Sequence, residues 1–188
     1  MYHSFFFSIY NVVIASPFLS RLAVFCAVTL PYITLIAAVF FLIAHSDPSI
    51  PKRSLWKHFW HKVNEMCLVF GSVLFSWSLV EIIKWIVAAP RPFLYFSSVN
   101  PLITFGGYDS FPSGHAAFYA ALATALTLYH PRTGALFYLL ALVIGVSRIA
   151  VGVHYPVDVL AGFAFGVVVT YATYHALLAI DFIKKQAK

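Results

Sequence analysis

Three short stretches hold most of the residues that could do chemistry in this otherwise apolar chain. The first is "KWIVAAPRP", the second is "SFPSGHAAF" and the third is "SRIAVGVHYPVD". Their ionisable residues are three cations, two histidines and one aspartate, namely Lys84, Arg91, His115, Arg148, His154 and Asp158. Ionisable side chains are costly in apolar surroundings, so their presence there indicates a functional site.

The three cations favour a highly charged anion as the ligand. Lys84, Arg91 and Arg148 stay protonated at neutral pH, and the planar fork of an arginine pairs with phosphate oxygens. Ser113 and Gly114 open an expected helix, whose N-terminal amides and dipole also attract anions. Glycine at that position lets the backbone approach a ligand closely. The pattern predicts a phosphate-binding site.

The histidines add a nucleophile and a proton-transfer group. Asp158 follows His154 by four residues, and Pro156 between them suits the first turn of a helix. The carboxylate can then bond one ring nitrogen of His154, which leaves the other nitrogen free to attack. His115 supplies a second imidazole that can protonate a leaving oxygen. This set of residues predicts phosphoryl transfer.

The elements that position these residues are predicted to be membrane helices. The chain has 188 residues, of which 62% are hydrophobic and 10% charged, and its mean hydropathy is +0.88. Soluble domains are about half apolar and about a quarter charged. Runs of about 20 apolar residues indicate membrane-spanning helices. We expect five spans, at residues 22–44, 63–89, 115–129, 134–153 and 157–183.

The predicted fold is therefore all-α: one polytopic membrane bundle, residues 1–188, with five to six transmembrane helices. Residues 1–20 contain no lysine or arginine, so they lack the basic region of a cleavable signal. Residues 5–19 would span only about 22 Å as a helix. We expect residues 1–20 to form a short interfacial or partly inserted helix. Cys26 and Cys67 fall in apolar spans and indicate no disulfide framework.

The distribution of basic residues predicts the orientation. Threading the five spans puts eight cations on one face: Lys52, Arg53, Lys57, Lys62, Arg132, Lys184, Lys185 and Lys188. The other face receives Arg21 and the three cations of the candidate site. The positive-inside rule places the first face in the cytoplasm, so the candidate site faces outward. This anchoring charge explains most of the net charge of +6, and no nucleic-acid partner is needed.

The three stretches together resemble the signature of the type 2 phosphatidic acid phosphatase (PAP2) superfamily. Their pattern is K-x6-R-P, then P-S-G-H, then S-R-x5-H-x3-D, and it covers residues 84–162. The matching residues are Lys84, Arg91, Pro92, Pro112, Ser113, Gly114, His115, Ser147, Arg148, His154 and Asp158, with no departure at any signature position. Three spaced motifs in the right order are far more specific than any one of them.

The resemblance implies a helical core shared with the vanadium-dependent haloperoxidases and a mechanism without metal or cofactor. His154 would attack phosphorus, Asp158 would orient it, and His115 would protonate the leaving group and then activate water. The phosphate would be held by Lys84, Arg91, Arg148, Ser113 and Gly114. The substrate would be a lipid phosphate in the bilayer. We favour undecaprenyl diphosphate, hydrolysed on the periplasmic or exterior side of a bacterial cytoplasmic membrane, because the compact chain and outward site suit carrier-lipid recycling.

Several alternatives stay open at this point. The substrate could instead be phosphatidylglycerol phosphate, phosphatidic acid or a lipid A phosphate, and the phosphoryl group could pass to another lipid. A lipid-phosphate transporter would keep the cations but would not need both histidines and the aspartate. Lys84 could also pair with Glu81, and Ser113 could be only a helix cap. Asp109 is given no catalytic role, the loop 93–111 could cover a headgroup, and His130 shows no partner in the sequence.

Overall fold

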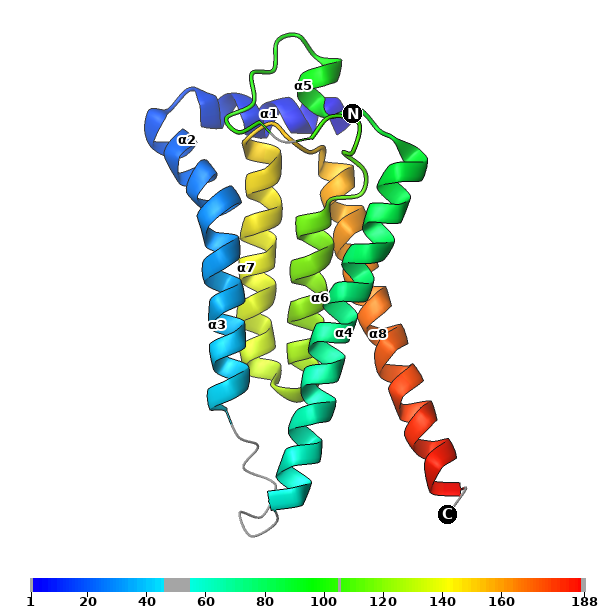
Figure 1. Ribbon diagram of the computed structural model, residues 1–188. Coiled ribbons are helices and arrows are strands. Elements are labelled where there is room, and N and C mark those ends of the chain that lie inside the picture. Colours follow the sequence, from blue (N-terminus) through cyan, green and yellow to red (C-terminus); the bar gives the residue numbers. More distant parts are fainter. Residues whose placement is uncertain (1, 46–54, 105, 187–188) are drawn as a thin grey trace.

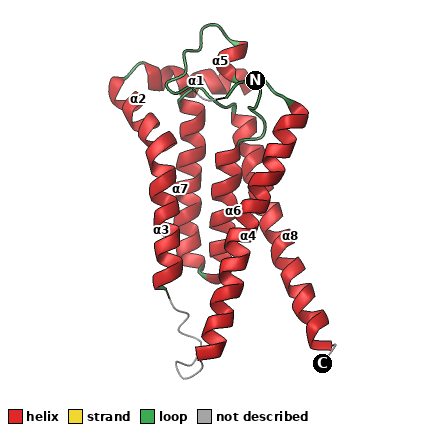
Figure 2. Ribbon diagram, in the orientation of Figure 1, coloured by secondary structure: helices red, strands yellow, loops and turns green. Residues whose placement is uncertain are grey.

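The computed structural model describes residues 2–45, 55–104 and 106–186. Every regular element in these ranges is a helix (Figure 2), which confirms the predicted all-α fold. Three of the cations on which the predicted orientation rests, Lys52, Arg53 and Lys188, lie outside the described residues.

Five long helices lie side by side in a bundle (Figure 1). They are α3 (Leu30–Ala44), α4 (Leu55–Val87), α6 (Gly114–Tyr129), α7 (Pro131–Ala150) and α8 (Pro156–Gln186). Four stretches of the described chain are long and apolar enough to cross a membrane: Pro17–Ala44, Phe59–Tyr95, Pro131–Ala150 and Pro156–Ile180. Helix α6 has only 16 residues, so it is about 24 Å long and is not among these four stretches. The four stretches indicate that the chain is an integral membrane protein.

Helix α6 forms the centre of the bundle and packs against α4, α7 and α8. Small residues let it approach α8 closely. A Cβ added at Gly162 would lie 2.4 Å from the carbonyl oxygen of Ser113, and one at Gly166 would lie 2.4 Å from that of Ala117. Small residues four positions apart on one helix are a common means of close packing in membranes. This contact holds the start of α6, where His115 lies, against α8.

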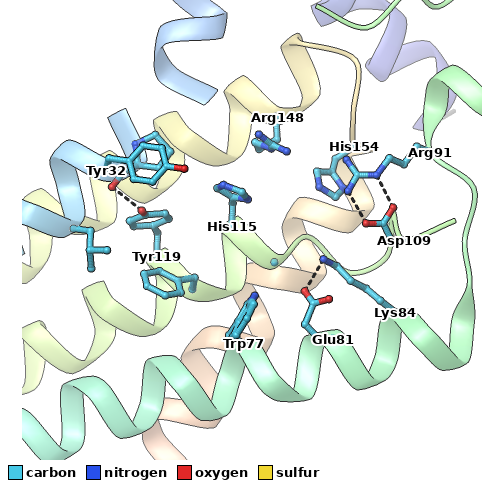
Figure 3. Close-up of a pocket in the computed structure, with 14 residues that line it drawn as sticks. Tyr32, Trp77, Glu81, Lys84, Arg91, Asp109, His115, Tyr119, Arg148 and His154 are labelled. Carbon is cyan, nitrogen blue, oxygen red and sulfur yellow. Dashed lines mark hydrogen bonds and ion pairs between the residues drawn. The ribbon is translucent and has the colours of Figure 1, made fainter. Parts of the chain in front are cut away.

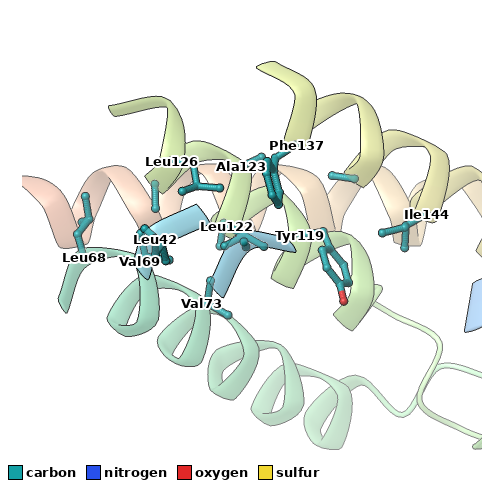
Figure 4. Close-up of a cluster of buried hydrophobic side chains, with 14 residues drawn as sticks. Leu42, Leu68, Val69, Val73, Tyr119, Leu122, Ala123, Leu126, Phe137 and Ile144 are labelled. Atoms are coloured by element: carbon teal, nitrogen blue, oxygen red, sulfur yellow. The ribbon is translucent and has the colours of Figure 1, made fainter. Parts of the chain in front are cut away.

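Buried apolar side chains join α6 to the helices on its other sides (Figure 4). Leu42 of α3, Val69 of α4, Leu122 of α6 and Ile144 of α7 belong to this cluster, and each is at most 2% exposed. In a bilayer the exterior is as apolar as the interior, so burial alone does not drive association. The fit of these side chains therefore selects how the helices pack.

Helix α1 (Tyr2–Ile14) lies across one end of the bundle (Figure 1). Its Tyr10 is 2% exposed. The Tyr10 hydroxyl donates to the carbonyl oxygen of Asn100 at 2.7 Å and accepts from the amide of the same residue at 2.9 Å. These bonds fasten α1 to the segment that follows the short helix α5 (Pro92–Tyr95). The interfacial placement expected for this segment stays a prediction.

The N-terminal helix expected over residues 1–20 is divided at Ser16. The Ser16 side chain accepts from the amide of Leu19 and caps a second helix, α2 (Pro17–Val24), which has Pro17 in its first turn. Proline suits that position because the missing N–H would have no helical partner there. The first long span consequently begins at Pro17, earlier than the expected residue 22.

The opposite end of the bundle contains a buried ion cluster. Glu65 of α4 is 1% exposed. Its Oε2 accepts from Nζ of Lys62 at 2.8 Å, and its Oε1 lies 2.7 Å from Nε2 of His130. Lys62 also donates to the carbonyl oxygen of His45 at 2.7 Å. The sequence showed no partner pattern for His130 because its partner, Glu65, lies 65 residues away in the chain. The cluster ties together the ends of α3, α4 and α6.

Candidate active site

The three chemical stretches meet at one cavity of about 380 Å³, near the end of the bundle where α1 lies (Figure 3). Side chains from α3, α4, α6 and α7 and from the connecting segments line it. Six predicted site residues are among them: Lys84, Arg91, Gly114, His115, Arg148 and His154. The other two are not among them: Ser113 directly precedes Gly114 in the chain, and Asp158 lies 3.5 Å from His154. Topology thus brings together side chains that are far apart in sequence.

Lys84 reaches the cavity from the last turn of α4. Its Nζ lies 2.8 Å from Oε1 of Glu81, whose side chain is 46% exposed. The pairing considered from the sequence is therefore present. The Lys84 side chain itself is only 11% exposed, so the pair is open on the Glu81 side alone. A Cβ at Gly114 would lie 3.2 Å from Nζ of Lys84, and glycine there opens the start of α6 to the cation.

Arg91 enters from the segment before the short helix α5 (Pro92–Tyr95). It is 3% exposed, and its guanidinium makes two parallel hydrogen bonds with Asp109. Nε donates to Oδ1 at 2.8 Å and Nη2 donates to Oδ2 at 2.9 Å. Sequence reasoning assigned Asp109 no role. The available signal was a lone acidic residue beside two glycines in the loop before His115.

Ser113 is the N-cap of α6, and its Oγ accepts from the amide of Ala116 at 3.5 Å. The Ser113 amide donates to the carbonyl oxygen of Asp158 at 2.9 Å, which joins the start of α6 to α8. These contacts place His115 in the first turn of α6 and against the cavity. Ser113 therefore acts as a helix cap, and its role as a phosphate ligand stays a prediction.

A left-handed turn brings His154 back over the end of α7. Gly152 has φ +83°, a backbone conformation that residues with a Cβ rarely adopt. The amides of Val153 and His154 then donate to the carbonyl oxygen of Arg148, at 3.2 and 3.3 Å. The nucleophile candidate and a phosphate-binding candidate are therefore linked through one carbonyl group.

A π-helical stretch holds the side chain of Arg148. This stretch, η1 (Phe25–Thr29), lies between α2 and α3, and such interruptions are frequent at functional sites. Nη1 of Arg148 donates to the carbonyl oxygen of Ala27 at 3.2 Å. Nε of Arg148 is buried and has no hydrogen-bond partner among the described residues. No pattern in the sequence indicated the contact with Ala27.

Asp158 lies behind His154 and is 2% exposed. Its Oδ2 accepts from the hydroxyl of Ser110 at 2.6 Å and from the amide of Tyr155 at 2.8 Å. The same oxygen is 3.5 Å from Nδ1 of His154. That separation is long for a hydrogen bond, and a movement of about 0.5 Å would close it. The carboxylate is thus fixed on one side of the imidazole. Sequence reasoning missed Ser110, although it is adjacent to Asp109.

Electrostatics keep the candidate nucleophile His154 neutral beside Arg91 and Arg148. Burial lowers the pKa of His154 to about 4, and the neighbouring Asp158 opposes this shift. The ring is therefore uncharged at pH 7 and keeps a lone pair for attack. The hydrogen bonds from Arg91 lower the pKa of Asp109 to about 2, so this carboxylate stays ionised. Among the described residues, no three histidine, cysteine or acidic side chains are grouped as metal ligands.

Comparisons with known proteins converge on one family. The model of the PAP2 superfamily matches residues 65–181. The chain is 36% identical over 102 residues to a lipid A 1-phosphatase from Rhizobium etli, a match covering 52% of this chain and 44% of that protein. It is 38% identical over 93 residues to the bacitracin transport permease protein BcrC from Bacillus licheniformis, covering 50% and 46%.

A third relative, an undecaprenyl-diphosphatase from Sulfolobus acidocaldarius, is 35% identical over 89 residues, covering 47% of this chain and 43% of that protein. The matched part spans less than half the length of each of these three relatives. The crystal structure of Aquifex aeolicus LpxE superposes with a TM-score of 0.71 at 24% identity, covering 92% of this chain and 93% of that one. This likeness shows that the two chains share a helical-bundle fold.

Proposed function

Because the chain belongs to the PAP2 superfamily, we propose that it hydrolyses a lipid phosphate or diphosphate through a phosphohistidine intermediate. The observation that carries this proposal is the arrangement around His154. This buried imidazole lines a cavity together with Lys84, Arg91 and Arg148, and Asp158 is fixed behind it. A neutral nucleophile facing three cations suits attack on an anionic phosphorus centre.

In the first step His154 forms a bond to phosphorus and the bond from phosphorus to the leaving oxygen breaks. Nδ1 of His154 faces Asp158, so Nε2 is the attacking atom. Asp158 stabilises the positive charge that develops on the ring. His115, at the N-terminus of α6, acts in its protonated form, which the negative charge of the bound phosphate favours, and gives a proton to the leaving lipid oxygen. The cations neutralise the charge that builds up on the phosphoryl oxygens.

In the second step water replaces the histidine on phosphorus. His115 is neutral after the first step and can take a proton from this water, whose oxygen attacks phosphorus while the bond to Nε2 of His154 breaks. Inorganic phosphate leaves, and both histidines return to their initial states. No metal ion or cofactor enters either step.

A second cavity supports a lipid as the substrate. It has a volume of about 210 Å³, its lining is wholly apolar, and it lies among α3, α4 and α6. Leu35 and Phe118 line both this cavity and the one that contains His154. A phosphate group at the cations would therefore have an apolar path beside it for a hydrocarbon chain.

We favour undecaprenyl diphosphate as the substrate, hydrolysed on the outer side of a bacterial cytoplasmic membrane. A relative named undecaprenyl-diphosphatase supports this choice, and three cations suit the charge of a diphosphate. The relative named lipid A 1-phosphatase favours a lipid A phosphate as the second candidate. Phosphatidic acid and phosphatidylglycerol phosphate complete the panel to be tested.

Phosphate release by the purified protein in excess EDTA tests this function. We expect release from at least one lipid of the panel, and the ranking names the substrate. His154→Ala should abolish release while leaving lipid binding measurable, whereas His175→Ala, an exposed histidine of α8, should retain wild-type activity. Release that survives His154→Ala would refute the phosphohistidine. Binding of lipid phosphates without any release would favour a transporter. With a substrate labelled in its phosphate group, transfer of the label to a second lipid would identify a phosphotransferase.

A further inference from the structure

The loop before α6 is built around the carboxylate of Asp109. The Gly107 amide donates to Oδ1 of Asp109 at 2.7 Å, and the amide of Arg91 donates to the carbonyl oxygen of Gly107 at 3.1 Å. The side chain of Arg91 then donates twice to the same carboxylate, at 2.8 and 2.9 Å. Arg91 is thus fastened to this loop through both its backbone and its side chain.

Gly106 makes room for this carboxylate. Gly106 has φ +67°, and a Cβ there would lie 2.3 Å from Oδ1 of Asp109. Any other residue at position 106 would displace the carboxylate as well as strain the backbone. The amide of Ser110 donates to the carbonyl oxygen of Ala89 at 3.0 Å, which anchors the other end of the turn. The loop therefore fixes where Asp109 can lie.

The pairing leaves one end of the Arg91 guanidinium available. Nε and Nη2 are occupied by Asp109, whereas Nη1 is buried and has no hydrogen-bond partner in the described part of the chain. Arg91 is 3% exposed and lines the cavity that contains His154 (Figure 3). A buried N–H group without a partner is energetically costly, so a bound oxygen there would remove that cost.

We propose that Asp109 is a positioning residue that orients the guanidinium of Arg91 so that Nη1 meets an oxygen of the substrate phosphate. The ligand class, a phosphate group, rests on the proposed function. A role for Asp109 as a proton donor does not fit, because its two oxygens accept three hydrogen bonds and the carboxylate stays ionised. Its contribution acts through Arg91.

The test compares Asp109→Asn, Arg91→Gln and the double variant, with Ser98→Ala as a control at an exposed position of the same loop. Asparagine keeps the size but turns an N–H group toward Arg91. Supporting residues of this kind typically change function by roughly 10- to 100-fold. We expect a loss of that size in kcat/KM and an equal rise in the inhibition constant for orthovanadate, a phosphate analogue.

The double variant separates positioning from a general structural role. If Asp109 acts through Arg91, adding Asp109→Asn to Arg91→Gln should change kcat/KM and vanadate binding by less than about twofold. Losses that multiply in the double variant, or a change of less than twofold in Asp109→Asn alone, would overturn the proposal. Vanadate-induced shifts of the thermal midpoint supply the comparison if a variant is too slow to assay.

A charge-preserving variant covers the case in which Asp109→Asn does not fold. Asp109→Glu moves the carboxylate out of the turn made by Gly106 and Gly107, and it should also weaken vanadate binding by roughly tenfold or more. Wild-type binding in Asp109→Glu would contradict the positioning role.

Failure of the hydrolase proposal can be distinguished from failure of the positioning proposal. If the wild type releases no phosphate but binds vanadate more tightly than Asp109→Asn does, the hydrolase proposal fails and the positioning role stands.

Discussion

Replacing Gly162 by alanine should lower activity although Gly162 touches no ligand. The added Cβ would lie 2.4 Å from the carbonyl oxygen of Ser113 and 2.9 Å from Cβ of Ala116. A carbon meets a carbonyl oxygen no closer than about 3.3 Å, so α8 and the start of α6 must separate by about 0.9 Å. His115 lies in that first turn, and a displacement of 1 Å at a reacting group can reduce the rate by about 100-fold.

Gly166→Ala is the matched control, because it creates the same 2.4 Å contact one turn further along, with the carbonyl oxygen of Ala117. Both variants should destabilise the protein by about 1–3 kcal/mol. Gly71→Ala, where an added Cβ has nothing within 4 Å, should change neither stability nor activity. The assays are phosphate release from the preferred lipid and thermal unfolding in detergent.

Stability and activity should respond differently in these variants. Gly162→Ala should lose about 100-fold in kcat, whereas Gly166→Ala should lose less than about tenfold at similar stability. Equal activity losses in the two variants would show that helix separation, and not the position of His115, controls the rate. Full activity in Gly162→Ala would show that the start of α6 does not need this close contact.

Two further outcomes follow from the buried charges. The kcat/KM of the wild type should fall as the pH drops through about 4, because attack requires neutral His154, whose pKa burial lowers to that value. Asp158→Asn should move this fall to lower pH, since Asp158 raises the pKa of His154. A fall near pH 6.5 in both proteins would contradict a buried His154 beside Asp158. Glu65→Ala should destabilise the protein by about 2–3 kcal/mol, because Lys62 and His130 lose a charge-assisted partner. Thermal unfolding of this variant beside His175→Ala measures the loss, and an unchanged midpoint would show that the cluster contributes nothing.

The helical class and the composition of the site were predictable because both depend on local patterns. Apolar runs long enough for a bilayer predicted the bundle, and the short motifs that contain Arg91, His115 and His154 predicted a single phosphate site. Threading the spans also predicted that these motifs meet, since alternate connections return to the same side. The division of the N-terminal segment at Ser16 was missed, because a serine followed by proline was not weighed as a helix cap.

The supporting contacts depended on packing between distant segments. Three hydrogen bonds join residues that are 18, 48 and 121 positions apart. They are the bonds between Arg91 and Asp109, between Ser110 and Asp158, and between Arg148 and the Ala27 carbonyl. No local periodicity encodes such pairs, because each requires two loops or helices to be placed first. The sequence by itself predicted a membrane bundle, a candidate nucleophile, a candidate proton donor and three candidate phosphate-binding cations. The tertiary structure alone decided which atoms of those side chains have hydrogen-bond partners and which side chains line the cavity, because hydrogen bonds depend on positions that differ by less than 1 Å.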